Sequence, residues 1–384
     1  MKFLRTLFKW VIAPITILLI LLYAFKLGYL LKAINTIYFN GHTTAFLDDY
    51  KQFDNHTIED GIAQPWPIHS GYNSKNTTKN LQKLNDKFGT IAFMIIKNDS
   101  IWLEEYYDGY TKDSHTNSFS MAKSMVSAML GRAIMEGKIK SLEEPVGNYF
   151  SEFNNGIAAD LTVGDLSSMA SGLNWDESYY SPFSITTRAY FDNNLKELML
   201  GVKVVEEPGK RHEYLSGNTE LLGMVISKAT GKSLSEYLSA TFWQPMGAAH
   251  QAFWQIDSEE NGMEKAYCCI ASNARDFARF GKLYKDHGKW KGQSLLDSSF
   301  ISKSITPRFK ESPQYGYGWW LLDHNQKKFF MMWGHLGQYV IVNPKDNIII
   351  VRLGHKSSDD VDDTHPFNSD IYSYIDEAYN ILTK

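Results

Sequence analysis

The chain has 384 residues, of which 43% are hydrophobic, 14% aromatic and 21% charged. This length and composition can build one large or two modest domains with a sizeable core, and they exclude wholesale disorder. A formal net charge of −4 gives no basic surface of the kind that nucleic-acid binding requires, so nucleic acid is excluded as a partner.

The cysteine and histidine content indicates neither a metal site nor a disulfide framework. The two cysteines, Cys268 and Cys269, are neighbours, and their Cα atoms lie closer together than a disulfide normally requires. We therefore expect two buried, small hydrophobic side chains and not a redox pair. The sequence has no metal-ligand spacing such as H-E-x-x-H or paired C-x-x-C, so no metal is expected.

Residues 1–31 are far more apolar than the rest of the chain. Basic residues precede an uncharged run over 10–25, Lys26 interrupts it, and residues 27–31 restore the apolar character. A bilayer needs roughly 20 apolar residues, and the span reaches that length if Lys26 snorkels to the interface.

Three interpretations of this run compete: a cleaved signal peptide, a buried core helix and an uncleaved signal anchor. The run is followed by a poor cleavage site and is bracketed by basic residues, so we expect residues 1–31 to be a transmembrane signal anchor. A small excess of basic residues before the run favours a cytoplasmic amino terminus. The prediction is a single-pass membrane protein whose folded body is periplasmic or otherwise extracytoplasmic.

The remainder divides into a polar segment, residues 32–80, and a folded body, residues 81–384. Gly, Pro and Asn interrupt residues 32–80, which we expect to be a linker and docking segment. From Gly89 the pattern becomes strand-like, and residues 89–107 predict a hairpin with a tight Asn98–Asp99 turn.

Helical periodicity begins after Ser120 and ends near Gly137. Residues 140–310 are expected to be mostly helical with long loops, and a capping-box pattern predicts a helix that starts at 233. Strands return near the end of the chain, two of them joined by a Pro344–Asn347 turn, and an amphipathic helix closes it. Strands at both ends with helices between them predict an α+β fold, in which both ends form one antiparallel sheet beside flanking helices and an inserted helical subdomain.

Ser120 and Lys123 are the first candidates for chemistry. Residues three apart on a helix share a face, so the hydroxyl and the amine can lie within hydrogen-bond reach. A lysine held neutral by burial and cationic neighbours can deprotonate a serine, and a helix amino terminus can stabilise an oxyanion. An exposed helix cap explains the same pattern, because S-x-x-K also arises by chance. The apolar helix behind the motif favours the chemical interpretation, since burying a lysine is costly.

Two further segments place polar side chains at the ends of predicted elements. Tyr214-Leu-Ser216 lies in a polar turn that leads into a helix, and GHLGQ at 334–338 begins an apolar strand. Taken singly, Tyr214 is equally well explained as a core tyrosine, and His335 as a histidine at a strand end. Together with S-x-x-K, and in this order, the three segments form a recognisable set.

From about Phe88 to the carboxy terminus, the chain resembles the serine β-lactamase and penicillin-binding protein superfamily. The resemblance is strongest to the class C β-lactamase-like branch, which includes esterases and 6-aminohexanoate-dimer hydrolases. It also rests on LEEPVGNYF (142–150), LTVGDLSSMASGLNWDE (161–177), NTELLGMVISKATGKSLSEYL (218–238), WQPMGA (243–248), ASNARDFARFGKLY (271–284) and YGYGWW (315–320). The resemblance implies a β-lactamase/transpeptidase-like fold and an acyl-enzyme mechanism without a cofactor.

Residue by residue, the resemblance implies that Ser120 is the nucleophile, Lys123 the base that activates it and Tyr214 the proton relay to the leaving group. Whether Lys123 or Tyr214 is the acylation base stays open. The backbone N–H groups of Ser120 and Gln338 match the two donors of an oxyanion hole.

Three more residues match substrate-binding positions of the superfamily. His335 and Gly337 belong to the third motif, where glycine lets the edge strand approach the substrate closely. Ser216 belongs to the second motif and is expected to orient the base.

Two departures from the superfamily pattern narrow the expected function. β-Lactamases and penicillin-binding proteins usually have Lys-Thr-Gly where this chain has His-Leu-Gly, and class C enzymes have Tyr-x-Asn where it has Tyr-Leu-Ser. Both variants resemble the esterase and amide-hydrolase branch. We therefore expect a membrane-anchored serine hydrolase acting on a small-molecule ester or amide. The alternatives are a D-alanyl-D-alanine or D-amino-acid peptidase of cell-wall fragments, and a non-catalytic binding module that retains the fold.

Overall fold

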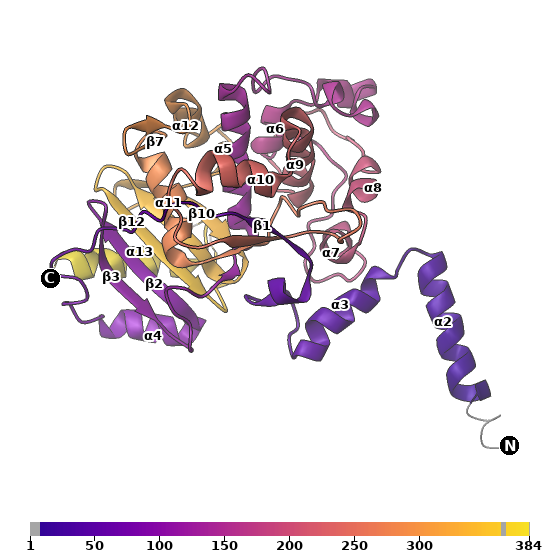
Figure 1. Cartoon of the computed structure of the whole chain (residues 1–384), viewed down its shortest axis with the longest axis horizontal. Helices are drawn as coiled ribbons and strands as arrows, with labels where there is room; N and C mark the ends of the chain where they lie inside the picture. The colour runs from indigo at the N-terminus through magenta and orange to yellow at the C-terminus, as the bar shows by residue number, and fades with distance from the viewer. Residues whose placement is uncertain (1–7, 362–365, 384) are drawn as a thin grey trace.

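The computed structural model describes residues 8–361 and 366–383. Its strands form a six-stranded sheet in the order β3-β2-β12-β11-β10-β9, a four-stranded sheet in the order β1-β5-β6-β4, and the hairpin β7-β8 (Figure 1). The strand bounds are β1 Asn55–Ile58, β2 Thr90–Lys97, β3 Ser100–Tyr106, β4 Thr116–Asn117, β5 Ala252–Gln255, β6 Ile270–Ser272, β7 Lys289–Trp290, β8 Gln293–Ser294, β9 Trp320–His324, β10 Lys327–Gly334, β11 Gln338–Asn343 and β12 Ile348–Gly354.

The six-stranded sheet joins the two ends of the folded body, as the sequence predicted. Strand β2 pairs antiparallel with β12, and Ile95 lies opposite Ile350. The predicted hairpin is β2-β3, and its turn residues Asn98 and Asp99 have φ values of 49° and 61°. Two consecutive left-handed residues give the type of tight turn that matches the twist of a hairpin. The predicted α+β architecture is therefore confirmed.

Helices cover both faces of this sheet. Their bounds are α2 Ala13–Ala24, α3 Tyr29–Ile37, α4 Lys79–Phe88, α5 Ala122–Met135, α6 Val163–Ser167, α7 Ile185–Phe191, α8 Leu195–Leu200, α9 Ser216–Thr230, α10 Leu234–Leu238, α11 Ala274–Lys285, α12 Ser298–Ser304 and α13 Ser369–Thr383. Alternate residues of β2 face opposite sides, so Phe93 and Ile95 pack in the core beneath α4 and α13. Met94 and Ile96 belong to the larger core that contains α5, α9 and α11.

Helix α5 runs through the larger core and is buried along most of its length. The short 3-10 turn η4 (Phe119–Met121) leads directly into it. A Cβ on Gly131 would lie 2.5 Å from Cδ1 of Phe300, so this position must be glycine for α12 to pack against the helix. The predicted stop is confirmed, since α5 ends at Met135 and Gly137 adopts a left-handed φ of 68°.

Residues 1–7 of the predicted anchor lie outside the described residues, and over residues 8–31 the apolar run does not form the one continuous helix that the sequence predicted. Helix α2 is exposed on all sides and extends away from the body, whereas α3 packs against the body (Figure 1). Lys26 breaks the run with a left-handed φ of 56°, and its Nζ atom lies 2.7 Å from Oε1 of Glu197. Within the described residues no single helix is long and apolar enough to cross a membrane; Phe8–Ala24 and Tyr29–Asn40 meet that test only as a pair bent by 112°.

Residues 32–80 lie against the body over much of their length. Strand β1 pairs with β5, and Ile37 of α3 packs with Phe53 and Phe191. Asp49 is fully buried between this segment and the body. Its carboxylate accepts hydrogen bonds from Asn117 Nδ2 at 2.9 Å, Gln255 Nε2 at 2.9 Å and the Tyr190 hydroxyl at 2.5 Å.

Replacing Asp49 with alanine should destabilise the whole chain, because it leaves three buried donors without their acceptor. We expect a loss of about 2 to 4 kcal/mol in the free energy of unfolding. Urea denaturation of Asp49→Ala and of the exposed neighbour variant Asp54→Ala measures this. Equal stability of the two variants would show that the buried carboxylate contributes nothing.

Candidate active site

Ser120 and Lys123 are brought together by the start of helix α5. Ser120 lies in the η4 turn, and one turn later Lys123 Nζ lies 2.9 Å from the Ser120 Oγ atom. Phe119, directly before the serine, has a left-handed φ of 45°, and its N–H donates to Asn117 Oδ1 at 2.8 Å. This strained residue turns the chain from β4 into the helix, which leaves Ser120 in the first turn where backbone N–H groups lack helical partners.

Lys123 is almost completely buried, with 3% of its surface exposed. Its Nζ atom also donates to the Tyr267 carbonyl oxygen at 2.9 Å and lies 5.1 Å from the centre of the Tyr214 ring. Burial lowers the pKa of this amine to about 8, while the carboxylates of Glu177 and Glu220 act in the opposite direction. Among the described residues no cationic neighbour contributes to this shift, and desolvation alone lowers the pKa of Lys123.

Tyr214 lies just before helix α9, with its ring beside the amine of Lys123. Burial raises the pKa of its hydroxyl well above the ordinary value, and its contact with the Ser120 hydroxyl opposes that rise. Tyr214 is therefore a neutral phenol at physiological pH. Of the two candidate bases, the amine of Lys123 is the one whose deprotonated form is accessible near neutrality.

Ser216 begins helix α9 and is bound by a residue that the sequence analysis did not single out. Its hydroxyl donates to Glu177 Oε1 at 2.6 Å, and its backbone N–H donates to Glu177 Oε2 at 2.6 Å. The carboxylate thus caps this helix and stays close enough to Lys123 to influence its pKa. Ser216 therefore binds the carboxylate that influences Lys123, and no hydrogen bond between Ser216 and Lys123 is found in the described residues.

His335 faces Ser120 from the loop between β10 and β11. Its ring stacks on Tyr179 with centroids 5.9 Å apart and meets Phe119 edge-on at 5.5 Å. Burial lowers the pKa of the imidazole, although the carboxylate of Asp359 acts against that change. A neutral imidazole therefore stands where the superfamily usually has a lysine.

The third motif differs in detail from the sequence expectation. Strand β11 is internal to the sheet and not an edge strand, and a Cβ on Gly337 would lie 2.0 Å from Nη1 of Arg352, not against a substrate. The close approach is made by Gly334, where a Cβ would lie 2.4 Å from the Ser118 carbonyl oxygen. Glycine at 334 therefore lets the end of β10 lie against the turn that carries Ser120.

Gln338 begins β11, and its buried side chain is occupied by structural hydrogen bonds. Its Nε2 atom donates to the carbonyl oxygens of His335 at 3.0 Å and Gly354 at 2.8 Å. The side chain is therefore committed to shaping the loop, and the oxyanion role that the resemblance implies for the backbone N–H of Gln338 stays a prediction.

Arg352 is a second residue that the sequence analysis missed. It is fully buried in β12 and donates to the carbonyl oxygens of Leu336 at 3.0 Å, Gly337 at 2.8 Å and Phe88 at 2.7 Å. It therefore holds the loop that presents His335. A lone arginine inside the apolar run NIIIVRLG was the available signal, because a buried guanidinium requires partners. Glu177 gave no comparable signal, since an acidic residue in a polar loop is ordinary.

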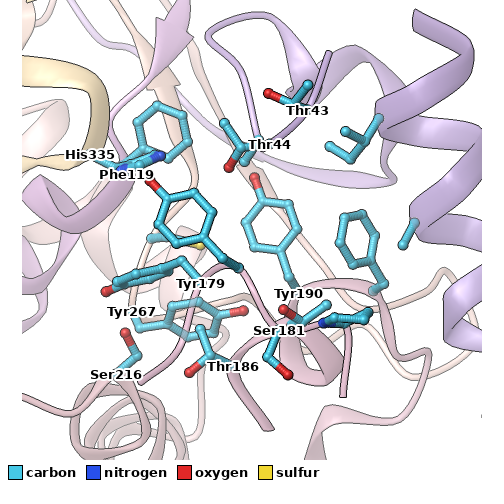
Figure 2. A pocket seen from close by; sticks show the side chains of 18 of the residues that line it. Thr43, Thr44, Phe119, Tyr179, Ser181, Thr186, Tyr190, Ser216, Tyr267 and His335 are labelled. Carbon is cyan, nitrogen blue, oxygen red and sulfur yellow. The ribbon is translucent and has the colours of Figure 1, made fainter. Parts of the chain in front are cut away.

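Two cavities meet at Ser120. One has a volume of about 210 Å³ and is mostly apolar; it lies between the nucleophile and the α3 segment, and Figure 2 shows Tyr179, Tyr190 and Tyr267 around it. The other, of about 520 Å³, is lined by Tyr214 and by the rings of Trp320 and Trp333, and also by the charged side chains of Glu177, Lys356 and Asp359. We call the first the apolar chamber and the second, after its charged side chains, the polar chamber. His335 lines both.

The cysteine prediction is partly wrong. Cys268 and Cys269 are both buried, as expected, but their sulfur atoms are paired as a disulfide between neighbouring residues. The two Cα atoms lie 3.7 Å apart, and Cys269 has a left-handed φ of 77°. In the residues that the structure describes, no group of three or more His, Cys, Asp or Glu side chains is arranged to hold a metal ion.

Comparison with known families decides the classification. The family model described as Beta-lactamase matches residues 77–370, which is most of the chain. The chain belongs to the β-lactamase family. The predicted membership of the serine β-lactamase and penicillin-binding protein superfamily is thereby confirmed, as is the prediction of a β-lactamase-related serine hydrolase.

Individual relatives are distant. The chain is 23% identical over 315 residues to the 6-aminohexanoate-dimer hydrolase of Paenarthrobacter ureafaciens, covering 76% of this chain and 79% of that one. A Bacillus anthracis structure assigned as a 6-aminohexanoate-dimer hydrolase has a TM-score of 0.72 at 22% identity, covering 86% and 91% of the two chains. A class C β-lactamase has a TM-score of 0.59 at 18% identity, covering 79% and 94%. At these identities the structural matches establish the shared fold.

The lowered pKa of Lys123 predicts a specific pH dependence. If its neutral amine is the base, kcat/KM for an ester should rise with pH up to about 8 and level off above it. Because the charge of Glu177 raises that pKa, Glu177→Gln should move the midpoint to lower pH. A pH–rate profile with p-nitrophenyl acetate measures both, with the exposed-site variant Glu152→Gln as control. If the midpoint does not move, the charge of Glu177 does not influence the group that titrates.

Proposed function

We propose that the chain is a serine hydrolase that cleaves a small-molecule ester or amide through an acyl-enzyme on Ser120, without a cofactor. The observation that carries this proposal is the 2.9 Å contact between the Ser120 hydroxyl and a buried Lys123 amine whose pKa is lowered to about 8. A lysine in this state accepts a proton from serine near neutral pH, whereas an exposed lysine is protonated there.

The chemistry assigns a role to each group. Lys123 takes the proton from Ser120 as the hydroxyl oxygen attacks the substrate carbonyl. The backbone N–H groups of Ser120 and Gln338 stabilise the resulting oxyanion. Tyr214 passes its proton to the departing oxygen or nitrogen and takes back the proton held by the Lys123 ammonium, so that both groups return to their neutral forms. A water molecule then attacks the acyl carbon, and the same groups transfer protons in the reverse order to release Ser120.

The neutral state of His335 favours an ester or amide over a β-lactam or a D-alanyl peptide. Those substrates carry a carboxylate that the usual lysine of the third motif helps to hold. Here the corresponding imidazole is uncharged, and the nearest cation lining the polar chamber is the exposed Lys356. A D-amino-acid peptidase is the second candidate, and Lys356 is the feature that supports it. Comparison of D-alanyl peptides with p-nitrophenyl esters and short amides separates the two.

A serine-reactive fluorophosphonate tests the nucleophile. Wild type should be labelled, and Ser120→Ala should lose the label because no other serine is paired with a buried amine in the described structure. Ser124→Ala is the matched control, since Ser124 lies on the same helix and donates only to the Gly318 carbonyl oxygen. Intact-protein mass spectrometry reports the adduct. Equal labelling of wild type and Ser120→Ala would refute the assignment, and no labelling of wild type would favour a non-catalytic module.

We also propose that the amino-terminal helices anchor the chain to a membrane, with the catalytic body outside the cytoplasm. Helix α2 carries no charged side chain and has no buried residue, so its apolar surface needs a partner. Lipid suits such a helix, which is hydrophobic around its whole circumference. The bend at Lys26 places α3 along the body instead of within the same span.

Alkaline carbonate extraction of cells that express the chain tests the anchor. The full-length chain should stay in the membrane pellet, whereas a variant that lacks residues 1–25 should enter the soluble fraction with its esterase activity intact. Release of the full-length chain into the soluble fraction would refute the anchor.

A further inference from the structure

We propose that the apolar chamber binds the acyl group of the substrate, that this group is apolar and larger than acetyl, and that helix α3 selects it. The inference rests on the proposed function. It goes beyond the family, because α3 and the segment after it precede residues 77–370, where the family model matches.

The amino-terminal segment forms one wall of the chamber. Ala33 and Ile37 line it from α3, Tyr38 lines it directly after the helix, and residues 43–45 continue the wall toward Ser120. Figure 2 shows Thr43 and Thr44 on this side, facing the labelled Tyr179 across the cavity. Without residues 29–45, the cavity beside the nucleophile would be open to solvent on that side.

The opposite wall is built by the body and combines apolar rings with the side chains of Ser181, Thr186 and Thr187. Tyr190 and Phe191 from α7 and Pro182 from the preceding loop line it, with Phe119 next to the nucleophile. The hydroxyl of Tyr190 is bound to the Asp49 carboxylate, so its ring, and not a free polar group, is what the chamber presents. No charged side chain lines this chamber within the described residues.

The volume fits a short chain or a ring. The chamber encloses about 210 Å³, and an apolar cavity of about 150 Å³ is large enough to bind benzene. Acetyl would leave most of this space empty. Burial of each further methylene favours binding about threefold to fourfold, so a longer acyl group gains from the chamber until it is full.

The position of Tyr214 indicates which part of the substrate enters the apolar chamber. The departing group needs a proton, and Tyr214 lines the polar chamber but not the apolar one. The leaving group therefore lies on the polar side of Ser120, together with Lys356 and Asp359. The acyl group, which stays on Ser120, extends to the other side and into the apolar chamber.

Helix α3 is fixed firmly enough to act as a selective wall. Lys32 Nζ donates to Asn193 Oδ1 at 3.0 Å and to the Asp257 carbonyl oxygen at 3.1 Å. The Tyr29 hydroxyl donates to the Pro182 carbonyl oxygen at 2.9 Å. These contacts join the two walls of the chamber and hold their separation.

The test is a series of p-nitrophenyl esters from acetate to decanoate with wild type, Ala33→Leu and Asn35→Leu. Wild type should gain at least tenfold in kcat/KM between acetate and hexanoate. Ala33→Leu adds volume inside the chamber and should lower kcat/KM for octanoate about tenfold while leaving acetate within twofold. Asn35→Leu places the same leucine side chain on the exposed face of α3 and should match wild type.

A second pair of substrates tests the direction of binding. Ala33→Leu should slow hydrolysis of methyl octanoate but not of octyl acetate, in which the chain belongs to the leaving group. A flat chain-length profile, equal loss on all esters, or slowing of octyl acetate instead would overturn the acyl assignment while Ser120-dependent acetate hydrolysis keeps the proposed function. Loss of wild-type esterase activity altogether, or its persistence in Ser120→Ala, would overturn both.

Discussion

The burial of one amine is the constraint on which the rest of the site depends. An ammonium group enclosed by protein is strongly disfavoured, so Lys123 is driven toward the neutral form that can act as a base. That effect requires α5 to run through the larger core, and Gly131 permits it by letting α12 pack close. Glu177 and Glu220 limit the shift and keep the amine near the pH at which proton transfer is efficient. Packing and reactivity are thus parts of one arrangement.

Asp49 extends this arrangement to the amino-terminal segment. It binds Asn117, and Asn117 in turn accepts the N–H of Phe119, the left-handed residue before the nucleophile. The same carboxylate binds Tyr190, whose ring lines the apolar chamber. A segment outside the matched family region therefore supports both the strained turn that carries Ser120 and one wall of the cavity beside it. Its docking is part of how the site is built.

Features that depend on local sequence were predictable, and features that depend on tertiary contacts were not. The β2-β3 hairpin, the start and stop of α5 and the set of Ser120, Lys123 and Tyr214 follow from periodicity, turn chemistry and motif order. The Lys26 bend was missed because an apolar run looks continuous, whereas the Glu197 partner that fixes the lysine lies far along the chain. Gly337 was chosen over Gly334 because only the packed structure shows which glycine faces the Ser118 carbonyl oxygen. The cysteine pair depends on an unusual backbone angle that composition does not reveal.

The two chambers distinguish the acyl side of Ser120 from the leaving-group side. A serine hydrolase must place the acyl and leaving groups on opposite sides of its nucleophile, and here only one of those sides carries charged side chains. Charged and titratable groups gather where a proton must be delivered, beside Tyr214. Apolar rings and helix α3 line the apolar chamber, where the acyl group must stay bound until deacylation. Water needs access only to the carbonyl carbon of the acyl-enzyme. Because α3 joins the exposed apolar helix α2 to the chamber wall, the segment proposed to touch lipid is continuous with the one proposed to select the acyl group. An amphiphilic substrate would meet both requirements at once, with its acyl group toward α3 and its polar part toward Lys356.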